Sequence, residues 1–521
     1  MNNFKETVLN ITSKYKIPII CFIFLLVFCH IYIIQSHMYI ESDLSNMVLE
    51  ADDFLKGNFL LRGWNNEWFS TGITYLTTDL LYFLFSVGLF GISKTSVYLG
   101  CSLYAFMTFI TAFLLIKDDI KKLTVSNLII FLLVCGLSFS SIKCLHVHCG
   151  CFVWSYIIFF LAAKYLNSQN QKYLIPILIL LSVSIFGDMI AVTLVVLPII
   201  IYACTKMFYN KEFDKYIPLI KYLLLSVVIS SILLKLYLNA AHIVYNFKPL
   251  TFITPEELYY NFILVAKEIA IVFGAAEFYT HRIFNVWTNL IAIGGFAVLF
   301  AGAYLVFINI KDSLTNKQTD FLSVCLSYSI IIQIALLFLT TYNNDIHNAR
   351  YIAFMPINCA IIILRRYNCF EMFSKKQFSI IVSCLALVFC VSAIYSYHKY
   401  ENKVSSDYLE TILDKHNLTH GVNNEYWGSS SITVSSKNKI KVRNIELDEN
   451  GNMIPSIWFS KKDWYDEPVE FVAININADN ARGIKKLVEN KAKSRIDFME
   501  YTLFILKDEY KNTIMTHKKA S

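Results

Sequence analysis

Long apolar runs separated by short polar loops recur along most of this chain. A helix of roughly 17–25 apolar residues is long enough to cross the hydrocarbon layer of a bilayer. Eleven segments of this kind precede residue 399, and the chain beyond that residue lacks them. They lie near residues 17–36, 96–116, 125–142, 152–166, 173–187, 189–205, 218–239, 284–308, 321–340, 351–365 and 378–396. The pattern predicts a polytopic α-helical membrane protein with about eleven transmembrane helices.

Composition agrees with this class of protein. Hydrophobic residues make up 56% of the 521 residues and charged residues only 16%, which excludes a disordered chain and an ordinary cytosolic enzyme. The net charge of +7 is typical of basic cytoplasmic loops, so we expect membrane lipid, and no nucleic acid, as a partner. Most of the 13 cysteines lie in apolar runs and indicate no disulfide framework.

The segment Tyr75–Ile92 decides the topology. If it does not cross, the inner loops hold 18 Lys and Arg residues and the outer loops hold nine; if it crosses, this bias reverses. The positive-inside rule therefore favours a cytoplasmic N-terminus and an interfacial helix over this segment. The alternative is that Tyr75–Ile92 crosses as a twelfth span and that the chain obeys the positive-inside rule only weakly. We expect a multi-pass protein of the cytoplasmic (inner) membrane, with residues 1–398 in the membrane part and 399–521 outside.

Three sizeable pieces then lie on the outer side. The first is the loop 37–95, and the second is the region 240–283, which holds a further interfacial helix over Asn261–Phe273. The third is a small soluble α/β domain over 399–521. Its predicted strands are Ser431–Val434, Lys439–Ile445, Val469–Ile476 and Tyr501–Leu506. Its predicted helix is Ala481–Asn490, and its predicted turn is Asp448–Gly451.

The first outer loop is rich in acids just past the first span. Six acids stand against two bases between His37 and Ser70. Asp43, as an exposed carboxylate at the membrane–water boundary, can take a proton from an acceptor hydroxyl. Alternatively, Asp43 caps a helix over Leu44–Lys56 that ends at Gly57.

An arginine marks the loop between the ninth and tenth predicted spans. Arg350 lies at the membrane boundary, where a charge is unfavourable unless it pairs or binds something. A guanidinium suits a phosphate bidentately, and His347 and Asp345 are placed to assist. The alternative is an arginine that snorkels at the end of a span.

Three further features are candidates. Asp188, at the turn between the fifth and sixth spans, either caps the next span or lines the same cavity. His148 belongs to a Cys- and His-rich run over 143–151 that has zinc-type ligands but matches no standard metal site. We therefore expect a substrate contact from His148, assign no metal ligand, and leave a divalent metal open. Aromatic residues of the tail suit sugar rings or an ordinary core: Trp427, Trp458, Trp464 and Tyr465.

The order of motifs in the first outer loop resembles the GT-C glycosyltransferases, polytopic enzymes that take a sugar from a polyprenyl-phosphate carrier. The motifs are Glu41-Ser42-Asp43, the helix over 44–56, Gly57-Asn58, Trp64 and Trp68, and Leu80–Phe90 followed by Gly91. The resemblance implies that Asp43 is the catalytic carboxylate, that Trp64 belongs to an aromatic substrate patch, and that Leu80–Phe90 does not cross. Ser42 stands where related branches often have a second acid, so Glu41 is the alternative base.

A second resemblance covers the late loop and the tail. The pattern Arg350-Tyr351, with Pro356 five residues on, looks like the late-loop arginine of bacterial GT-C-like proteins, which implies that Arg350 and Tyr351 bind the carrier phosphate. The tail resembles, more weakly, the outer tail of bacterial glycosyltransferase-like membrane proteins.

These resemblances imply an inverting glycosyltransferase. The expected donor is a polyprenyl-phosphate sugar, and the acceptor is a lipid-linked or surface glycan such as an O-antigen. A lipid-linked glycan flippase or transporter, or a glycan polymerase, is the rival. A flippase usually carries charge in its central spans, and these are almost free of charge here.

Overall fold

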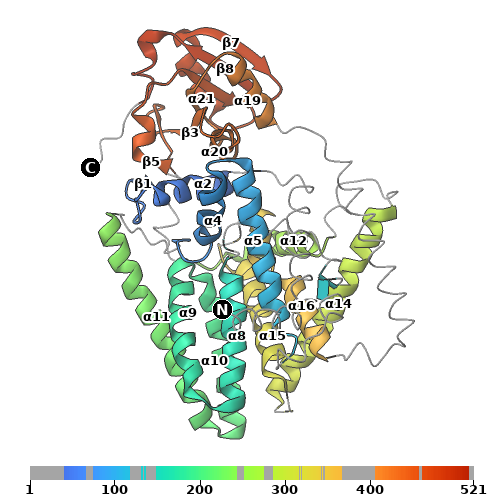
Figure 1. Cartoon of the computed structure of the whole chain (residues 1–521). Helices are drawn as coiled ribbons and strands as arrows, with labels where there is room; N and C mark the ends of the chain where they lie inside the picture. Colours follow the sequence, from blue (N-terminus) through green and yellow to red (C-terminus); the bar gives the residue numbers. More distant parts are fainter. Residues whose placement is uncertain are drawn as a thin grey trace, which may run out of the picture.

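A computed structural model of the chain shows a helical part with a small sheet-containing domain on one end (Figure 1), which we call the soluble domain after its predicted location. The structure describes residues 40, 42–65, 74–117, 131–132, 134–135, 148, 150–242, 251–274, 286–315, 317, 319–341, 343, 346–366, 405–456 and 460–515. The predicted spans 17–36 and 378–396 lie outside these residues, and so does 125–142 apart from residues 131–132 and 134–135.

Within the described residues, six helices are long and apolar enough to cross a membrane. Each coincides with a predicted span. They are α5 (Lys94–Phe113), α8 (Gly150–Ser168), the continuous pair η3 (Val192–Val196, π-helical) and α10 (Leu197–Asn210), α11 (Phe213–Ala241), α14 (Val286–Leu314) and α15 (Phe321–Leu339). The described part of the chain is thus typical of a multi-pass membrane protein.

The predicted number of eleven spans is not confirmed. Two predicted spans, 173–187 and 351–365, are shorter helices: α9 (Leu174–Gly187), preceded by the 3₁₀ turn η2 (Gln171–Tyr173), and α16 (Met355–Arg366). At a rise of 1.5 Å per residue, a helix of 12–14 residues covers only about 18–21 Å, less than the hydrocarbon thickness of about 30 Å. The sequence predicted the bounds of α9 to within one residue and began α16 four residues too early, so it is the assignment of both as spans that is not confirmed.

Helix α4 (Leu80–Phe90) has the bounds that the sequence predicts. It ends at Gly91, whose φ of +61° lies in the left-handed region. Ser93 then caps α5 by accepting a hydrogen bond from the Ser96 amide. With 11 residues, α4 covers about 16 Å, so this helix by itself is too short to cross.

Two further helices lie at the end of the bundle nearest the soluble domain (Figure 1). Helix α2 (Ser42–Leu55) is followed by Gly57, whose φ is +103°, so the predicted stop at Gly57 is confirmed. Helix α12 (Pro255–Val272) begins with a capping box between Thr254 and Glu257 and overlaps the predicted helix Asn261–Phe273. It packs against the 3₁₀ helix η4 (Ile346–Ile352).

The soluble domain contains a mixed six-stranded sheet in the order β4-β3-β2-β6-β8-β7. The strands are β2 (His420–Asn423), β3 (Lys441–Leu447), β4 (Met453–Pro455), β6 (Phe471–Asn475), β7 (Ala492–Phe498) and β8 (Tyr501–Leu506). Strand β2 is parallel to β3 and β6, and the other pairs are antiparallel. The helices are α19 (Ser405–Lys415), α20 (Tyr426–Ser435) and α21 (Ala481–Val488), and the 3₁₀ turns are η5 (Lys462–Tyr465), η6 (Glu489–Lys491) and η7 (Asp508–Tyr510).

The sequence predicted three of these strands and helix α21, but it was wrong about Ser431–Val434. That β-branched stretch is the second half of α20, not a strand. Helix α20 packs against both α2 and β3, and Val434 belongs to the same apolar cluster as the membrane part. Tertiary packing therefore overrides a local preference for strand.

The soluble domain is joined to the segment between α2 and α4 by a short strand pair. Strand β1 (Trp64–Asn65) pairs antiparallel with β5 (Ser460–Lys461). Beside it, the Trp64 and Trp464 rings meet edge to face at 5.0 Å.

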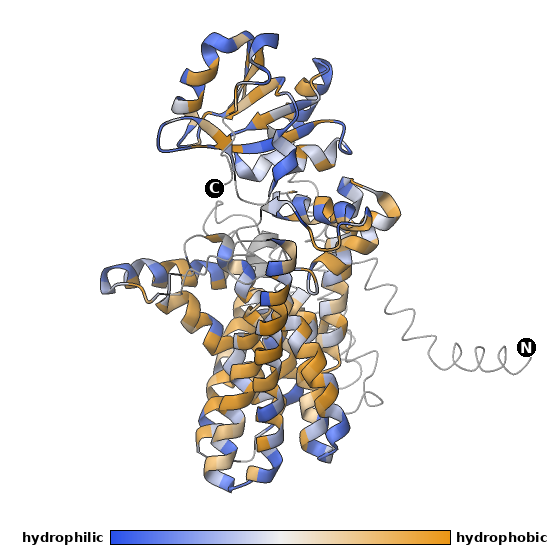
Figure 2. Ribbon diagram, turned by 90° about the vertical axis from the view of Figure 1, so that its left-hand side faces the viewer, coloured by the Kyte–Doolittle hydropathy of each residue, from blue (hydrophilic) through white to orange (hydrophobic). Residues whose placement is uncertain are grey.

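Hydropathy separates the two parts of the molecule. Figure 2 shows a largely hydrophobic helical bundle below a domain of mixed hydropathy. On α11 several apolar side chains face outward, among them Leu224, Val228, Ile232 and Leu236. Exposed apolar side chains on one long helix are typical of contact with lipid.

Candidate functional site

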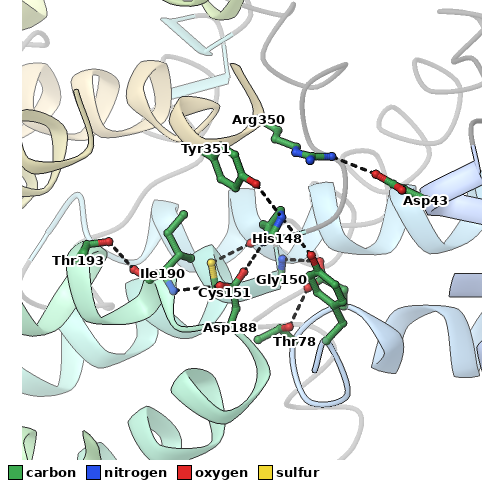
Figure 3. Close-up of polar contacts among 12 residues, drawn as sticks. Asp43, Thr78, His148, Gly150, Cys151, Asp188, Ile190, Thr193, Arg350 and Tyr351 are labelled. Atoms are coloured by element: carbon green, nitrogen blue, oxygen red, sulfur yellow. Dashed lines mark hydrogen bonds and ion pairs between the residues drawn. The ribbon is translucent and has the colours of Figure 1, made fainter. Parts of the chain in front are cut away.

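Side chains from four distant parts of the sequence lie together (Figure 3), and Asp43 among them contacts the soluble domain. Asp43 lies in the first turn of α2, and His148 precedes α8. Asp188 ends α9, and Arg350 and Tyr351 lie in η4. Five of the residues singled out in the sequence therefore come together, although up to 308 positions separate them.

Asp43 and Arg350 form a buried ion pair. The Nη1 atom of Arg350 donates to Oδ2 of Asp43 at 3.1 Å. Asp43 is 3% exposed and Arg350 8%, so the carboxylate is not the exposed group expected from the sequence. Its first-turn position favours a negative charge, but its oxygens contact side chains from elsewhere in the chain.

The second half of the site is centred on His148. Its Nδ1 lies 2.7 Å from Oδ2 of Asp188, and its Nε2 lies 3.1 Å from the Tyr75 hydroxyl and 3.2 Å from the Tyr351 hydroxyl. The φ of His148 is +83°, an unfavourable value for a non-glycine residue that is held by its surroundings. Tyr351 joins the two halves, because its ring also lies 5.4 Å from the guanidinium carbon of Arg350.

Burial sets the protonation of this group. It lowers the pKa of His148 despite the neighbouring Asp188 carboxylate, because removal of water disfavours the imidazolium. The contact with Asp188 places the proton of the neutral ring on Nδ1, so Nε2 accepts. Burial also holds the pKa of Tyr75 well above its ordinary value, so its hydroxyl stays protonated.

Asp188 caps the next turn and also contacts His148. Its Oδ1 accepts from the Ile190 amide at 2.9 Å, while its Oδ2 holds His148 at 2.7 Å. The cap and the contact with His148 use different oxygens of one carboxylate.

Two glycines bring the segment that carries Tyr75 close to the bundle. A Cβ at Gly150 would lie 2.3 Å from the Thr78 carbonyl oxygen, and a Cβ at Gly187 would lie 2.6 Å from the Thr77 and Thr78 side chains. The amides of residues 74 and 75 donate to the Gly187 carbonyl at 3.0 Å each. The turn before α4 is thus held between the start of α8 and the end of α9.

A second buried carboxylate, Asp79, lies beside this turn. It accepts from the Thr78 hydroxyl at 2.7 Å, the Gly150 amide at 3.1 Å and the Tyr104 hydroxyl at 3.2 Å. Burial raises the pKa of Asp79 to about 7, and these three hydrogen bonds only partly oppose the shift.

Of the remaining predicted site residues, Trp64 lies elsewhere and the side chains of the others lie outside the described residues. Trp64 is buried at the junction with the soluble domain, where its Nε1 donates to Asp53 at 2.8 Å. Glu41, Asp345, Trp458 and the His347 side chain lie outside the described residues. Of the run over 143–151, only His148, Gly150 and Cys151 are described, and the described residues contain no group of three His, Cys, Asp or Glu placed to hold a metal ion.

Sequence reasoning missed three residues of the site. Tyr426, in the first turn of α20, donates its hydroxyl to Oδ1 of Asp43 at 2.5 Å. The stretch around Tyr426 drew attention for its aromatic residues, but nothing local indicates a contact with α2. Tyr75 and Asp79 lie at the edge of an apolar helix, where a Tyr or Asp is easily taken as a boundary residue.

Comparison with known proteins adds no assignment: no protein-family model matches the chain, and no curated protein matches it significantly. Function therefore has to be argued from the site. The site offers two hydrogen-bonded groups, a buried carboxylate with an arginine and a neutral histidine with two tyrosine hydroxyls, which are joined by the contact between Arg350 and the Tyr351 ring.

Proposed function

We propose that the protein is an inverting glycosyltransferase that moves a sugar from a polyprenyl-phosphate carrier to a lipid-linked or surface glycan. The observation that carries the proposal is the contact between Asp43 and Arg350. A carboxylate suited to act as a base and a guanidinium suited to a phosphate lie side by side at one end of an apolar bundle. A lipid-linked substrate presents its head group at such a place.

In the proposed reaction, Asp43 takes the proton from an acceptor hydroxyl. The acceptor oxygen attacks the anomeric carbon from the face opposite the phosphate, so the configuration inverts. The bond between that carbon and the phosphate oxygen breaks, and the carrier phosphate leaves with the electron pair. Arg350 stabilises the charge that develops on the leaving phosphate.

The ion pair is compatible with both roles. A guanidinium has five N–H donors in a planar fork, and the bond to Asp43 comes from Nη1. Arg350 can therefore contact a phosphate while it remains near Asp43.

The His148 group supports the proposal as the buried support of η4. Neutral His148, fixed by Asp188, holds the Tyr75 and Tyr351 hydroxyls at Nε2. Because Tyr351 follows Arg350 in η4, this group fixes the short element that carries the proposed phosphate ligand.

The proposed location is the outer face of the cytoplasmic membrane, with the N-terminus in the cytoplasm and the soluble domain outside. The proposed site lies at the same end of the bundle as the soluble domain (Figure 1). The side of the domain therefore determines the side of the chemistry.

The direct experiment is turnover of a polyprenyl-phosphate sugar by the purified protein in lipid nanodiscs, with glycans from cells that lack the protein as acceptors. The wild type is expected to attach sugar to these glycans and release polyprenyl phosphate. Asp43→Asn is expected to lower turnover per folded molecule by about 10²–10⁴-fold. Asp52→Asn is the matched control, because Asp52 lies on the same helix but pairs with the exposed Lys56.

The result also separates the rivals. Full turnover by Asp43→Asn would remove this carboxylate as the base and direct attention to Glu41. Movement of an intact lipid-linked sugar across the bilayer, without release of polyprenyl phosphate, would identify a flippase. Growth of a glycan by whole repeat units would identify a polymerase.

A further inference from the structure

The first turn of α20, in the soluble domain, is hydrogen-bonded to the first turn of α2. The Tyr426 hydroxyl donates to Asp43 at 2.5 Å, and the Ser42 hydroxyl donates to the Tyr426 carbonyl. The Ser430 amide donates back to the Ser42 hydroxyl at 3.3 Å, and the Ser430 hydroxyl donates to Asn46 at 2.7 Å. Four contacts therefore fix Tyr426 relative to the helix that carries Asp43.

A second attachment holds the domain at the far end of α2. Lys461 of β5 lies 3.1 Å from Asp53, which also accepts from Trp64, and Trp64 packs on Trp464. Because the domain contacts both ends of α2, the Tyr426 hydroxyl cannot move far from Asp43 without breaking polar contacts at one end or the other.

The apolar core is also continuous across the boundary. Val434 of α20 is fully buried in the cluster that contains Leu44 and Met47 of α2, and the Tyr426 ring packs against it. Figure 1 shows α20 directly over α2. The Tyr426 ring thus has a packing role, and its hydroxyl has a separate role at Asp43.

We propose that Tyr426 is a positioning residue for Asp43, so that the soluble domain completes the transfer site. This rests on the proposed function. A carboxylate accepts at about four lone-pair sites. With Arg350 on Oδ2 and Tyr426 on Oδ1, the plane of the carboxylate is fixed, and lone pairs remain on both oxygens for an acceptor hydroxyl. A base held in one orientation meets the acceptor in reactive geometry more often than a rotating one.

The test removes the hydroxyl and keeps the ring. Tyr426→Phe is expected to lower kcat about 10- to 100-fold, the range that corresponds to one hydrogen bond to a charged group, and to change the donor KM less than about twofold, because Arg350 is untouched. Tyr465→Phe is the matched control: its hydroxyl donates to the Asn444 carbonyl at 2.6 Å in the same domain. The control is expected to keep wild-type turnover per folded molecule.

A double-mutant cycle with Asp43→Asn shows whether Tyr426 acts through Asp43. In the Asp43→Asn background, Tyr426→Phe is expected to cause no further loss of residual turnover, because the group that it positions is gone. The same fold loss in both backgrounds would overturn the proposal, and so would an equal loss in Tyr465→Phe, which would indicate general loosening of the domain.

The two proposals fail in different ways. If Asp43→Asn turns over normally, the glycosyltransferase assignment of this carboxylate fails whatever Tyr426 does. If Asp43→Asn is inactive while Tyr426→Phe keeps wild-type kcat, only the positioning role fails. The Tm values of the wild type, Asp43→Asn, Tyr426→Phe and the double variant can be measured without any substrate. If the two single shifts in Tm add up to the shift of the double variant, Tyr426 and Asp43 are not coupled.

Discussion

Arg350 and Asp43 are buried together, so the effect of changing one depends on the other. Arg350→Ala leaves an unpaired buried carboxylate, and breaking a buried ion pair in this way destabilises by about 3–5 kcal/mol. The double variant Asp43→Asn/Arg350→Ala removes both charges and is expected to unfold at a higher temperature than Arg350→Ala. Thermal unfolding in one detergent measures both. A double variant less stable than the single one would contradict the pairing.

Turnover of Arg350→Lys tests the phosphate role separately from stability. Lysine keeps the charge but loses the planar fork, so a partial loss in donor use per folded molecule is expected, with a larger loss in Arg350→Ala. An arginine that only snorkels predicts a silent Lys variant and a lower protein yield for Ala. Full specific activity in Arg350→Ala would remove this residue from the site.

Asp79 gives the stability of the protein a pH dependence of known sign. Its pKa is raised from 3.8 to about 7 in the folded chain. Its contribution to the free energy of unfolding is therefore fully present below about pH 4 and is lost as the pH rises through about 7. The pKa of buried His148 is lowered, so its contribution to the free energy of unfolding rises with pH in the acidic range. His148 is present in both the wild type and Asp79→Asn, so this contribution is the same in the two proteins.

The test compares the wild type with Asp79→Asn, because the asparagine side chain has the shape of a protonated aspartic acid but does not titrate. Between about pH 5 and pH 8, the Tm of the wild type is expected to fall relative to that of Asp79→Asn. Parallel Tm curves over this range would contradict a raised pKa at Asp79.

At the scale of single elements, the sequence predicted those whose signals are local. The Phe90-Gly91 end of α4 and the Gly57 stop after α2 follow from glycine at positive φ, which is a property of the residue itself. The stretch Ser431–Val434 was mistaken for a strand because its environment, packed against α2 and β3, is not encoded in neighbouring residues. Short strands such as β2 and β4 have too few residues for a periodic pattern.

The turn before α4 offers a test at the same scale. Gly150→Ala would place a methyl group 2.3 Å from the Thr78 carbonyl oxygen, so the turn that carries Tyr75 has to move away. A loss of about 1–3 kcal/mol in stability is expected, together with lower turnover per folded molecule. Gly88→Ala is the control, because nothing lies within 4 Å of its added Cβ and alanine favours helix by up to about 1 kcal/mol. Equal stability of the two variants would contradict the close packing at Gly150.

At the scale of the whole molecule, the convergence of the site was not predictable from the sequence. Residue type and membrane-boundary position marked Asp43, His148, Asp188 and Arg350 one by one, but no local pattern indicates which of them meet. The pairing of Tyr426 with Asp43 depends on how the soluble domain docks, and that is set by contacts between residues more than 380 positions apart. Trp64 was predicted to belong to an aromatic substrate patch. In the structure it packs on Trp464 at the junction with the soluble domain instead.

The orientation of the whole molecule is the remaining prediction. The expected excess of 18 Lys and Arg residues over nine predicts that the soluble domain lies outside the cytoplasm. A reporter that is active only in the cytoplasm, fused after Ser521, is expected to be silent. The same reporter fused after Lys211, in the turn between α10 and α11 at the opposite end of the bundle (Figure 1), is expected to be active. Because Tyr426 contacts Asp43, the site lies on the side of the domain. An active reporter after Ser521 would therefore move the proposed chemistry to the cytoplasmic face and contradict an outer-face acceptor.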